Sequence, residues 1–121
     1  MSSEFLKNFA VIDDFLRSTS KGLLQKLDHM TFKATINMLK SDDPESVRIA
    51  IEQLAKEKNP LSIPPLYVVA KAHPSSFLKE KAQTALNTVD PQHEAEKLAE
   101  GKEYKDAVFL LVQHYGNYKG K

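Results

Sequence analysis

The chain has 121 residues, of which 41% are hydrophobic and 27% charged, as in an ordinary globular domain rather than a disordered segment. Seventeen basic residues against sixteen acidic ones give a net charge of +1, so the basic surplus typical of duplex-binding domains is absent and nucleic acid is a disfavoured partner. The absence of cysteine excludes disulfides, thiolate nucleophiles and sulfur-ligated metals.

The apolar segments of the sequence indicate where in the cell the chain resides. The longest apolar run, Ala107 to Val112, is far shorter than the ~20 residues that a membrane-spanning helix needs. Asp13 and Asp14 interrupt any apolar segment near the N-terminus, so no secretion signal is expected. We therefore predict no membrane span and a cytoplasmic location.

The N-terminal third predicts three short helices. The first carries a stripe of apolar residues at helical spacing: Phe5, Phe9, Ile12 and Leu16. The polar run 18–20 and Gly22 break this helix, and a second helix carries three leucines between residues 23 and 27. Thr31 is predicted to cap a third helix, which ends before Asp43. Residues 1–30 are expected to form N-terminal cap helices.

Four prolines, spaced 14 to 17 residues apart, mark the helix starts that follow. Each comes after a polar residue, in the pairs Asp43-Pro44, Asn59-Pro60, His73-Pro74 and Asp90-Pro91. Asp and Asn side chains accept hydrogen bonds from the first helical turn, and proline suits the first helical position because its missing N–H is not needed there. The pairs predict helices beginning at the four prolines, with Ser75 or Ser76 as the alternative cap of the third.

Apolar residues keep the helical period between these starts. The stripes are Val47, Ala50, Ile51 and Leu54; Ile63, Leu66, Val69 and Ala70; and Leu78, Ala82, Ala85, Leu86 and Val89. Ile49 and Tyr67 lie off these stripes and are expected to pack against a second neighbouring helix. No segment has the alternation of a half-buried strand, so the chain is predicted to be all-α, with about seven to eight helices.

A weak internal repeat relates the helix after Pro44 to the helix after Pro74. At an offset of 31 residues, Val47 aligns with Leu78, Ile51 with Ala82 and Ala55 with Leu86. Weak repeats of about this length, each a helical hairpin, are typical of α-solenoids, because a single hairpin cannot bury both of its apolar faces.

The residues of this repeat resemble a known family. Residues 43–54, Asp-Pro-Glu-Ser-Val-Arg-Ile-Ala-Ile-Glu-Gln-Leu, resemble the first helix of a HEAT repeat, and residues 63–66, Ile-Pro-Pro-Leu, resemble the start of its second helix. The likeness covers residues 31–89 and is nearest to the short HEAT-like units of phycobilisome-lyase-like proteins. It implies a short α-solenoid of stacked antiparallel helical hairpins, forming one domain over residues 1–115. It also implies that Arg48 links neighbouring repeats, with Asp43 or Asp90 as its partner.

Residues 90–115 are expected to form C-terminal cap helices, followed by a flexible tail over 116–121. A short polar helix is predicted from Glu94 to Glu100, closed by Gly101, and a last helix runs from about Glu103 to Tyr115.

The last helix is apolar nearly all round. Tyr104, Val108, Leu111 and Tyr115 form one stripe, and Phe109 and Val112 lie on the opposite side. Such a helix is either packed on several sides or leaves a face for a partner. We hypothesise that Phe109, Val112 and Tyr118 contribute to an interface with another protein or with a second copy of the chain.

No catalytic or cofactor-binding pattern is present. The four histidines lack the spacing of a zinc site, and the sequence has no nucleophile elbow or glycine-rich phosphate loop. We therefore expect no enzyme activity and no cofactor. The leading hypothesis is a protein–protein interaction module, such as an adaptor, an assembly factor or a regulatory subunit. A lyase-related or chaperone-like accessory factor for a chromophore-bearing protein, which the resemblance implies, and a nucleic-acid-binding helical repeat remain as alternatives.

Overall fold

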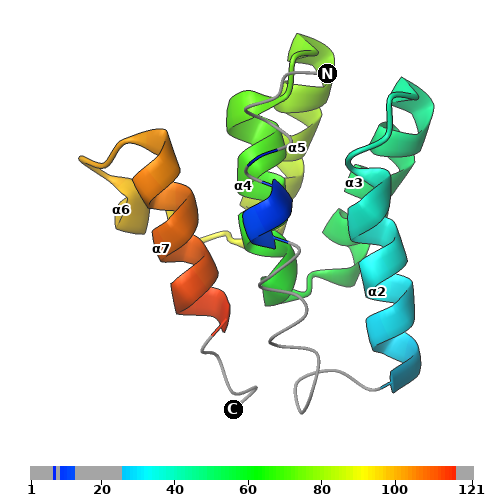
Figure 1. The fold of residues 1–121 in the computed structure, drawn as a ribbon, viewed down its shortest axis with the longest axis horizontal. Coiled ribbons are helices and arrows are strands. Elements are labelled where there is room, and N and C mark those ends of the chain that lie inside the picture. Colours follow the sequence, from blue (N-terminus) through cyan, green and yellow to red (C-terminus); the bar gives the residue numbers. More distant parts are fainter. Residues whose placement is uncertain (1–6, 8, 13–25, 117–121) are drawn as a thin grey trace.

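The computed structural model describes residues 7, 9–12 and 26–116, and the side chains of residues 7, 9–12 and 32–115 (Figure 1). This part of the chain is helical and contains no strand, which confirms the predicted all-α fold. Its elements after the N-terminal helical turn are α2 (Lys26–Met38), α3 (Pro44–Glu57), the 3-10 helix η1 (Pro60–Ser62), α4 (Ile63–Ala72), α5 (Ser76–Val89), α6 (Glu94–Ala99) and α7 (Tyr104–Gly116). The predicted tail, apart from Gly116, and Tyr118 lie outside the described residues.

The described helices pack in consecutive pairs. α2 packs against α3, α4 against α5 and α6 against α7 (Figure 1). Contacts of α3 with α5 and of α4 with α7 join these pairs. The principal neighbour of α4 is therefore α5, not α3. The short connection through His73 folds α5 back onto α4, whereas η1 separates α3 from α4.

A single hydrophobic core runs through all of these pairs. Phe9 and Ile12 of the N-terminal turn are completely buried and belong to the same core as residues from α2 to α7. The largest buried side chains of the other helices include Ile36, Leu54 and Leu111. The stripes predicted from helical spacing supply most of this core, as expected when burial of apolar area drives helix packing.

Two of the predicted caps begin their helices as expected. The Asp43 carboxylate accepts a hydrogen bond from the Glu45 N–H at 3.3 Å, so α3 begins at Pro44. The Asn59 side chain accepts from the Leu61 N–H at 2.9 Å and begins η1 at Pro60, which leads directly into α4. Both caps depend only on residues two positions away, which is why sequence spacing could locate them.

The third predicted helix, α5, begins after the alternative cap Ser75 and not at Pro74. α5 begins at Ser76, and the Ser75 hydroxyl accepts from the Leu78 N–H at 3.3 Å. The Nδ1 atom of His73 accepts from the Ser75 N–H at 2.9 Å, so this buried imidazole shapes the turn before the helix.

The predicted helix start at Pro91 is wrong. Residues 91–92 form a turn, and α6 begins only at Glu94. The buried Asp90 carboxylate reaches over this turn and accepts from the N–H groups of Glu94 at 3.0 Å and Ala95 at 2.9 Å. Asp90 therefore caps α6 from four residues before it, and His93, with φ 56°, supplies the left-handed residue that the turn requires.

The predicted helix start at Thr31 is also wrong, because α2 runs from Lys26 to Met38 and passes through Thr31. Residues 26–30, between the start of α2 and Thr31, include no glycine or proline that would interrupt a helix. At the other end, the predicted last helix is confirmed within one residue at each boundary.

Among the described residues, no helix combines the length and apolarity that crossing a bilayer would require.

Candidate functional site

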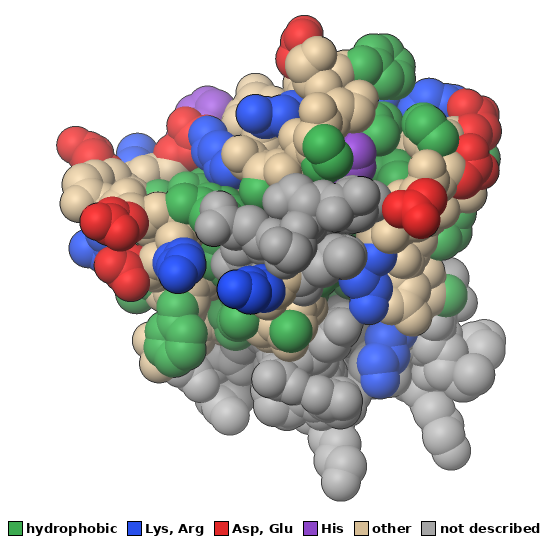
Figure 2. Space-filling view, turned by 45° about the horizontal axis from the view of Figure 1, so that its top comes forward, with side chains coloured by type: hydrophobic (Ala, Val, Ile, Leu, Met, Phe, Trp, Pro, Cys, Tyr) green, Lys and Arg blue, Asp and Glu red, His purple; other side chains and the backbone are tan. Residues whose placement is uncertain are grey.

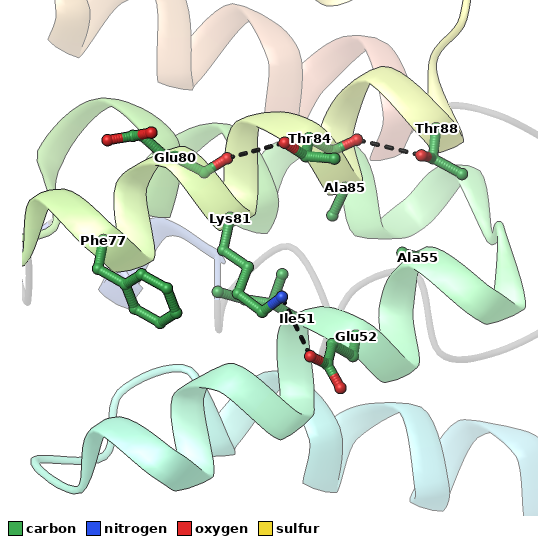
Figure 3. A pocket seen from close by; sticks show the side chains of 9 residues that line it. All are labelled: Ile51, Glu52, Ala55, Phe77, Glu80, Lys81, Thr84, Ala85 and Thr88. Carbon is green, nitrogen blue, oxygen red and sulfur yellow. Dashed lines mark hydrogen bonds and ion pairs between the residues drawn. The ribbon is translucent and has the colours of Figure 1, made fainter.

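An open groove lies between α3 and α5 (Figure 3). Its volume is about 340 Å³, and we call it the α3–α5 groove. The lining residues are Ile51, Glu52 and Ala55 from α3, and Phe77, Glu80, Lys81, Thr84, Ala85 and Thr88 from α5. Four of the α5 residues, at positions 77, 81, 84 and 88, recur at the spacing of one helix face, so the groove follows α5 along most of its length.

The groove is hollow because two of its lining residues are alanines. Ala55 on α3 is half-buried, and Ala85 on α5 is buried. Their methyl groups leave space that longer apolar side chains would fill. Ile51, only 1% exposed, forms part of the base. The lining is thus largely apolar although it is open to solvent.

Two threonines in the groove use their hydroxyl groups within α5. The Thr84 hydroxyl donates to the Glu80 carbonyl at 3.2 Å, and the Thr88 hydroxyl donates to the Thr84 carbonyl at 3.1 Å (Figure 3). These are the bonds that helical threonines commonly make to the preceding turn. A ligand in the groove therefore meets threonine methyl groups more than free donors.

One ion pair crosses the groove. Lys81 Nζ on α5 lies 3.1 Å from Glu52 Oε2 on α3 (Figure 3). Arg48 Nη1 lies 2.8 Å from the same carboxylate oxygen, and hydrogen bonds from Lys81 and Arg48 hold the pKa of Glu52 below its usual value. Glu80 is the remaining charged residue of the lining, and within the described part of the chain its carboxylate makes no ion pair.

Phe77 stands at the rim of the groove with 61% of its surface exposed. It immediately precedes Leu78, which enters the core at 1% exposure, so Phe77 points about 100° away from the core-facing direction. Large exposed aromatic side chains beside an apolar groove are typical of interaction sites. Phe77 is not among the interface residues predicted from the sequence, although its position beside the apolar stripe of α5 can be read from the helical spacing.

Two of the hypothetical interface residues, Phe109 and Val112, lie elsewhere, on α7. Phe109 is 57% exposed, Val112 is half-buried against the core, and Tyr118 is outside the described residues. Phe109 borders a surface hollow whose other residues are mostly polar: Gly101, Lys102, Glu103, Asp106, Leu110 and Gln113. Val108, Leu111 and Tyr115 of the predicted stripe are buried. The role of Phe109, Val112 and Tyr118 in binding stays a prediction.

The predicted partners of Arg48 are wrong. Its guanidinium binds Glu45 and Glu52 of its own helix, in place of Asp43 or Asp90. Those two carboxylates lie three residues before and four residues after Arg48, where a helical side chain reaches them without leaving its helix. The side chains of Asp43 and Asp90 are occupied at the starts of α3 and α6. The direct link from this cluster to α5 is made by Lys81.

Ile49 and Tyr67, which lie off their helical stripes, were both expected to pack against a second helix, and the structure confirms this only for Tyr67. Tyr67 is 6% exposed and stacks on Tyr104 of α7 at a centroid distance of 6.3 Å, which confirms that it packs against a second helix. Ile49 is 46% exposed, so the expectation that it is covered by a neighbouring helix is wrong. Viewed down the axis of α3, Ile49 lies past Glu52, on the solvent side of the α3–α5 groove.

Titratable side chains are spread over the described surface without forming a metal site. No group of three or more potential metal ligands occurs among the described residues. Burial lowers the pKa of His73, and burial together with the hydrogen bond to Glu94 raises the pKa of Tyr115. On the face shown in Figure 2, basic and acidic side chains are intermingled.

Comparison of the chain with family models, with curated proteins and with solved structures finds no match. The assignment of a function therefore depends on the groove and on the chemistry of its lining.

Proposed function

We propose that this chain is a protein-interaction module, an adaptor, assembly factor or regulatory subunit, that binds its partner through the α3–α5 groove. The observation that carries this proposal is a largely apolar, solvent-open groove with the 61% exposed Phe77 at its rim. Exposed aromatic residues and apolar clefts between helices are common features of protein-binding surfaces. In this proposal the chain contributes a binding surface and no catalysis or cofactor of its own.

We further propose that the fold is a short HEAT-like α-solenoid of stacked antiparallel hairpins. The 31-residue internal repeat equates α3 with α5, and these two helices pack side by side. Aligned pairs of the repeat, such as Val47 with Leu78 and Ile51 with Ala82, are buried in both helices. Equivalent helices of successive units adjoin in a solenoid, and the groove between them repeats as a binding surface.

The exposed side chain of Phe77 provides a driving force for association. A large aromatic side chain left in water favours association, because covering it removes apolar area from solvent. In measured interfaces a few such anchors supply most of the binding energy, and truncating one costs more than about 1–2 kcal/mol. Phe77 is therefore expected to dominate recognition by the groove.

The test is affinity purification from cells of the source organism, with mass spectrometry of the retained proteins. Wild-type protein is compared with Phe77→Ser and with Phe109→Ser, which removes a similarly exposed phenylalanine from α7 and tests the alternative interface predicted there. The proposal predicts a specific partner that Phe109→Ser retains and Phe77→Ser loses. Loss by Phe109→Ser alone would instead place the interface on α7, and circular dichroism checks that both variants are folded.

A further inference from the structure

We infer that the occupant of the α3–α5 groove is an amphipathic helix of the partner that carries an apolar stripe and a lysine or arginine opposite Glu80. This inference rests on the proposed function and deepens it, because it states the chemistry of the partner. Three observations support it: the shape of the groove, the neutral apolar character of its floor, and the charge left at its rim.

The shape of the groove fits a helix. It is bordered by α3 and α5, each 14 residues long, and two helices packed side by side present a channel into which the side chains of a third helix insert. An amphipathic helix laid into an apolar groove is one of the recurring modes of peptide recognition. β-strand addition, another of these modes, uses an open sheet edge, and the described part of this chain contains no strand.

The floor of the groove fits an apolar stripe. Ala55 and Ala85 leave space for side chains the size of leucine or methionine, and Phe77 offers an aromatic surface at the rim. The hydroxyl groups of Thr84 and Thr88 are used by backbone carbonyls of α5. Burying this lining under a ligand therefore leaves few polar groups without partners.

The charges of the lining favour a basic partner. Two carboxylates, Glu52 and Glu80, stand against one ammonium group, Lys81, so the lining has a formal net charge of −1. Lys81 is bound to Glu52, which also holds Arg48. The charge that remains for a ligand is the exposed carboxylate of Glu80, which attracts a cation and repels an anion.

The test uses two synthetic amphipathic peptides with the same leucine stripe, one with lysines and the other with glutamates at the flanking positions. Binding of each fluorescein-labelled peptide to the full chain is measured by fluorescence anisotropy. The lysine peptide is expected to bind about threefold more tightly, which is the effect of a surface ion pair, and the difference should shrink with added salt. Glu80→Lys should reverse the preference, whereas the matched control Glu103→Lys, an exposed acidic residue beside α7, should keep it.

A second pair of variants tests the place of binding. Phe77→Ser should weaken both peptides at least about tenfold, the usual effect of removing an aromatic anchor. The control Gln92→Ser, at an exposed position in the turn before α6, should leave both affinities unchanged. Ala55→Leu, at a half-buried position of the lining, fills the groove and should also weaken both peptides. Circular dichroism melts show which variants remain folded.

The outcomes separate this inference from the proposed function. Equal affinity for both peptides, or an unchanged preference in Glu80→Lys, would overturn the inference about charge. Full binding by Phe77→Ser, or no binding of either peptide up to about 1 mM, would overturn the inference that a helix occupies the groove. The proposed function fails separately, if wild-type protein retains no partner that Phe77→Ser loses in the affinity purification.

Discussion

Lys81 of α5 and Glu52 of α3 join the two helices that border the groove, with 3.1 Å between Lys81 Nζ and Glu52 Oε2. Arg48 binds the same oxygen at 2.8 Å, so one carboxylate receives two cations. Both partners of the Lys81–Glu52 pair are partly exposed to water, and exposed ion pairs contribute little to stability. The pair therefore serves mainly to neutralise charge at the groove.

Replacing Lys81 with Met should lower the melting temperature by less than about 5 °C, because a solvent-screened ion pair is lost while the aliphatic stem is kept. The difference from wild type should vanish at high salt. Thermal melts at low and high ionic strength measure both effects. Lys97→Met serves as the control, since Lys97 is exposed and no ion pair of it occurs in the described structure. A large loss of stability that persists in salt would show that Lys81 has a packing role.

Replacing Asp90 with Ala should destabilise the protein by about 1–2 kcal/mol, because two N–H groups at the start of α6 lose their acceptors. Asp90→Asn keeps one amide oxygen and should cost less than the alanine. Urea unfolding followed by circular dichroism provides the midpoints. Asp42→Ala, at an exposed position before α3, should have little effect. Equal midpoints for Asp90→Ala and wild type would contradict the capping role of Asp90.

Acidification should destabilise the protein through His73. Burial lowers the pKa of this histidine in the folded state, so the folded state resists the proton that the unfolded state accepts. The contribution of neutral His73 to the free energy of unfolding is therefore fully present above the unfolded pKa of about 6.5. This contribution falls as the pH drops below that value and levels off below the folded pKa. Protonation would also remove the Nδ1 acceptor used by the Ser75 N–H.

The measurement for His73 is the urea midpoint between pH 7.5 and pH 5. His73→Asn offers an amide oxygen near the place of Nδ1 and should flatten this part of the pH profile. His93→Asn, at an exposed position, should leave the slope unchanged. The same slope in wild type and His73→Asn would refute this account.

Two isoleucines on one helix provide a matched test of burial. Ile51 is 1% exposed and Ile49 is 46% exposed, although only one residue separates them. Ile51→Ala should cost about 2–4 kcal/mol through lost burial and a cavity, whereas Ile49→Ala should cost less than about 1 kcal/mol. Denaturant unfolding of both variants measures the difference. A large cost for Ile49→Ala would mean that a further part of the chain covers this side of α3.

Helix starts that depend on nearby residues could be predicted from the sequence. The Asp43 and Asn59 side chains bind N–H groups two residues ahead, and the apolar stripe of α3 repeats with the helical period. The prediction failed at Pro91, where the buried Asp90 carboxylate accepts from residues four and five positions ahead across a turn. Residue spacing does not reveal how a turn brings those N–H groups back to the carboxylate.

By itself, the sequence determined that the chain is all-α and which faces of its central helices are apolar, because those properties depend on interactions within a few residues. Tertiary structure decided that α4 packs mainly against α5 and that Arg48 shares Glu52 with Lys81 of another helix. It also decided the candidate site. Ala55 and Ala85 form a hollow only because α3 and α5 lie side by side, and Phe77 is a rim residue only in relation to that hollow. These relationships join residues far apart in the chain, so the local periodicity of either helix does not contain them.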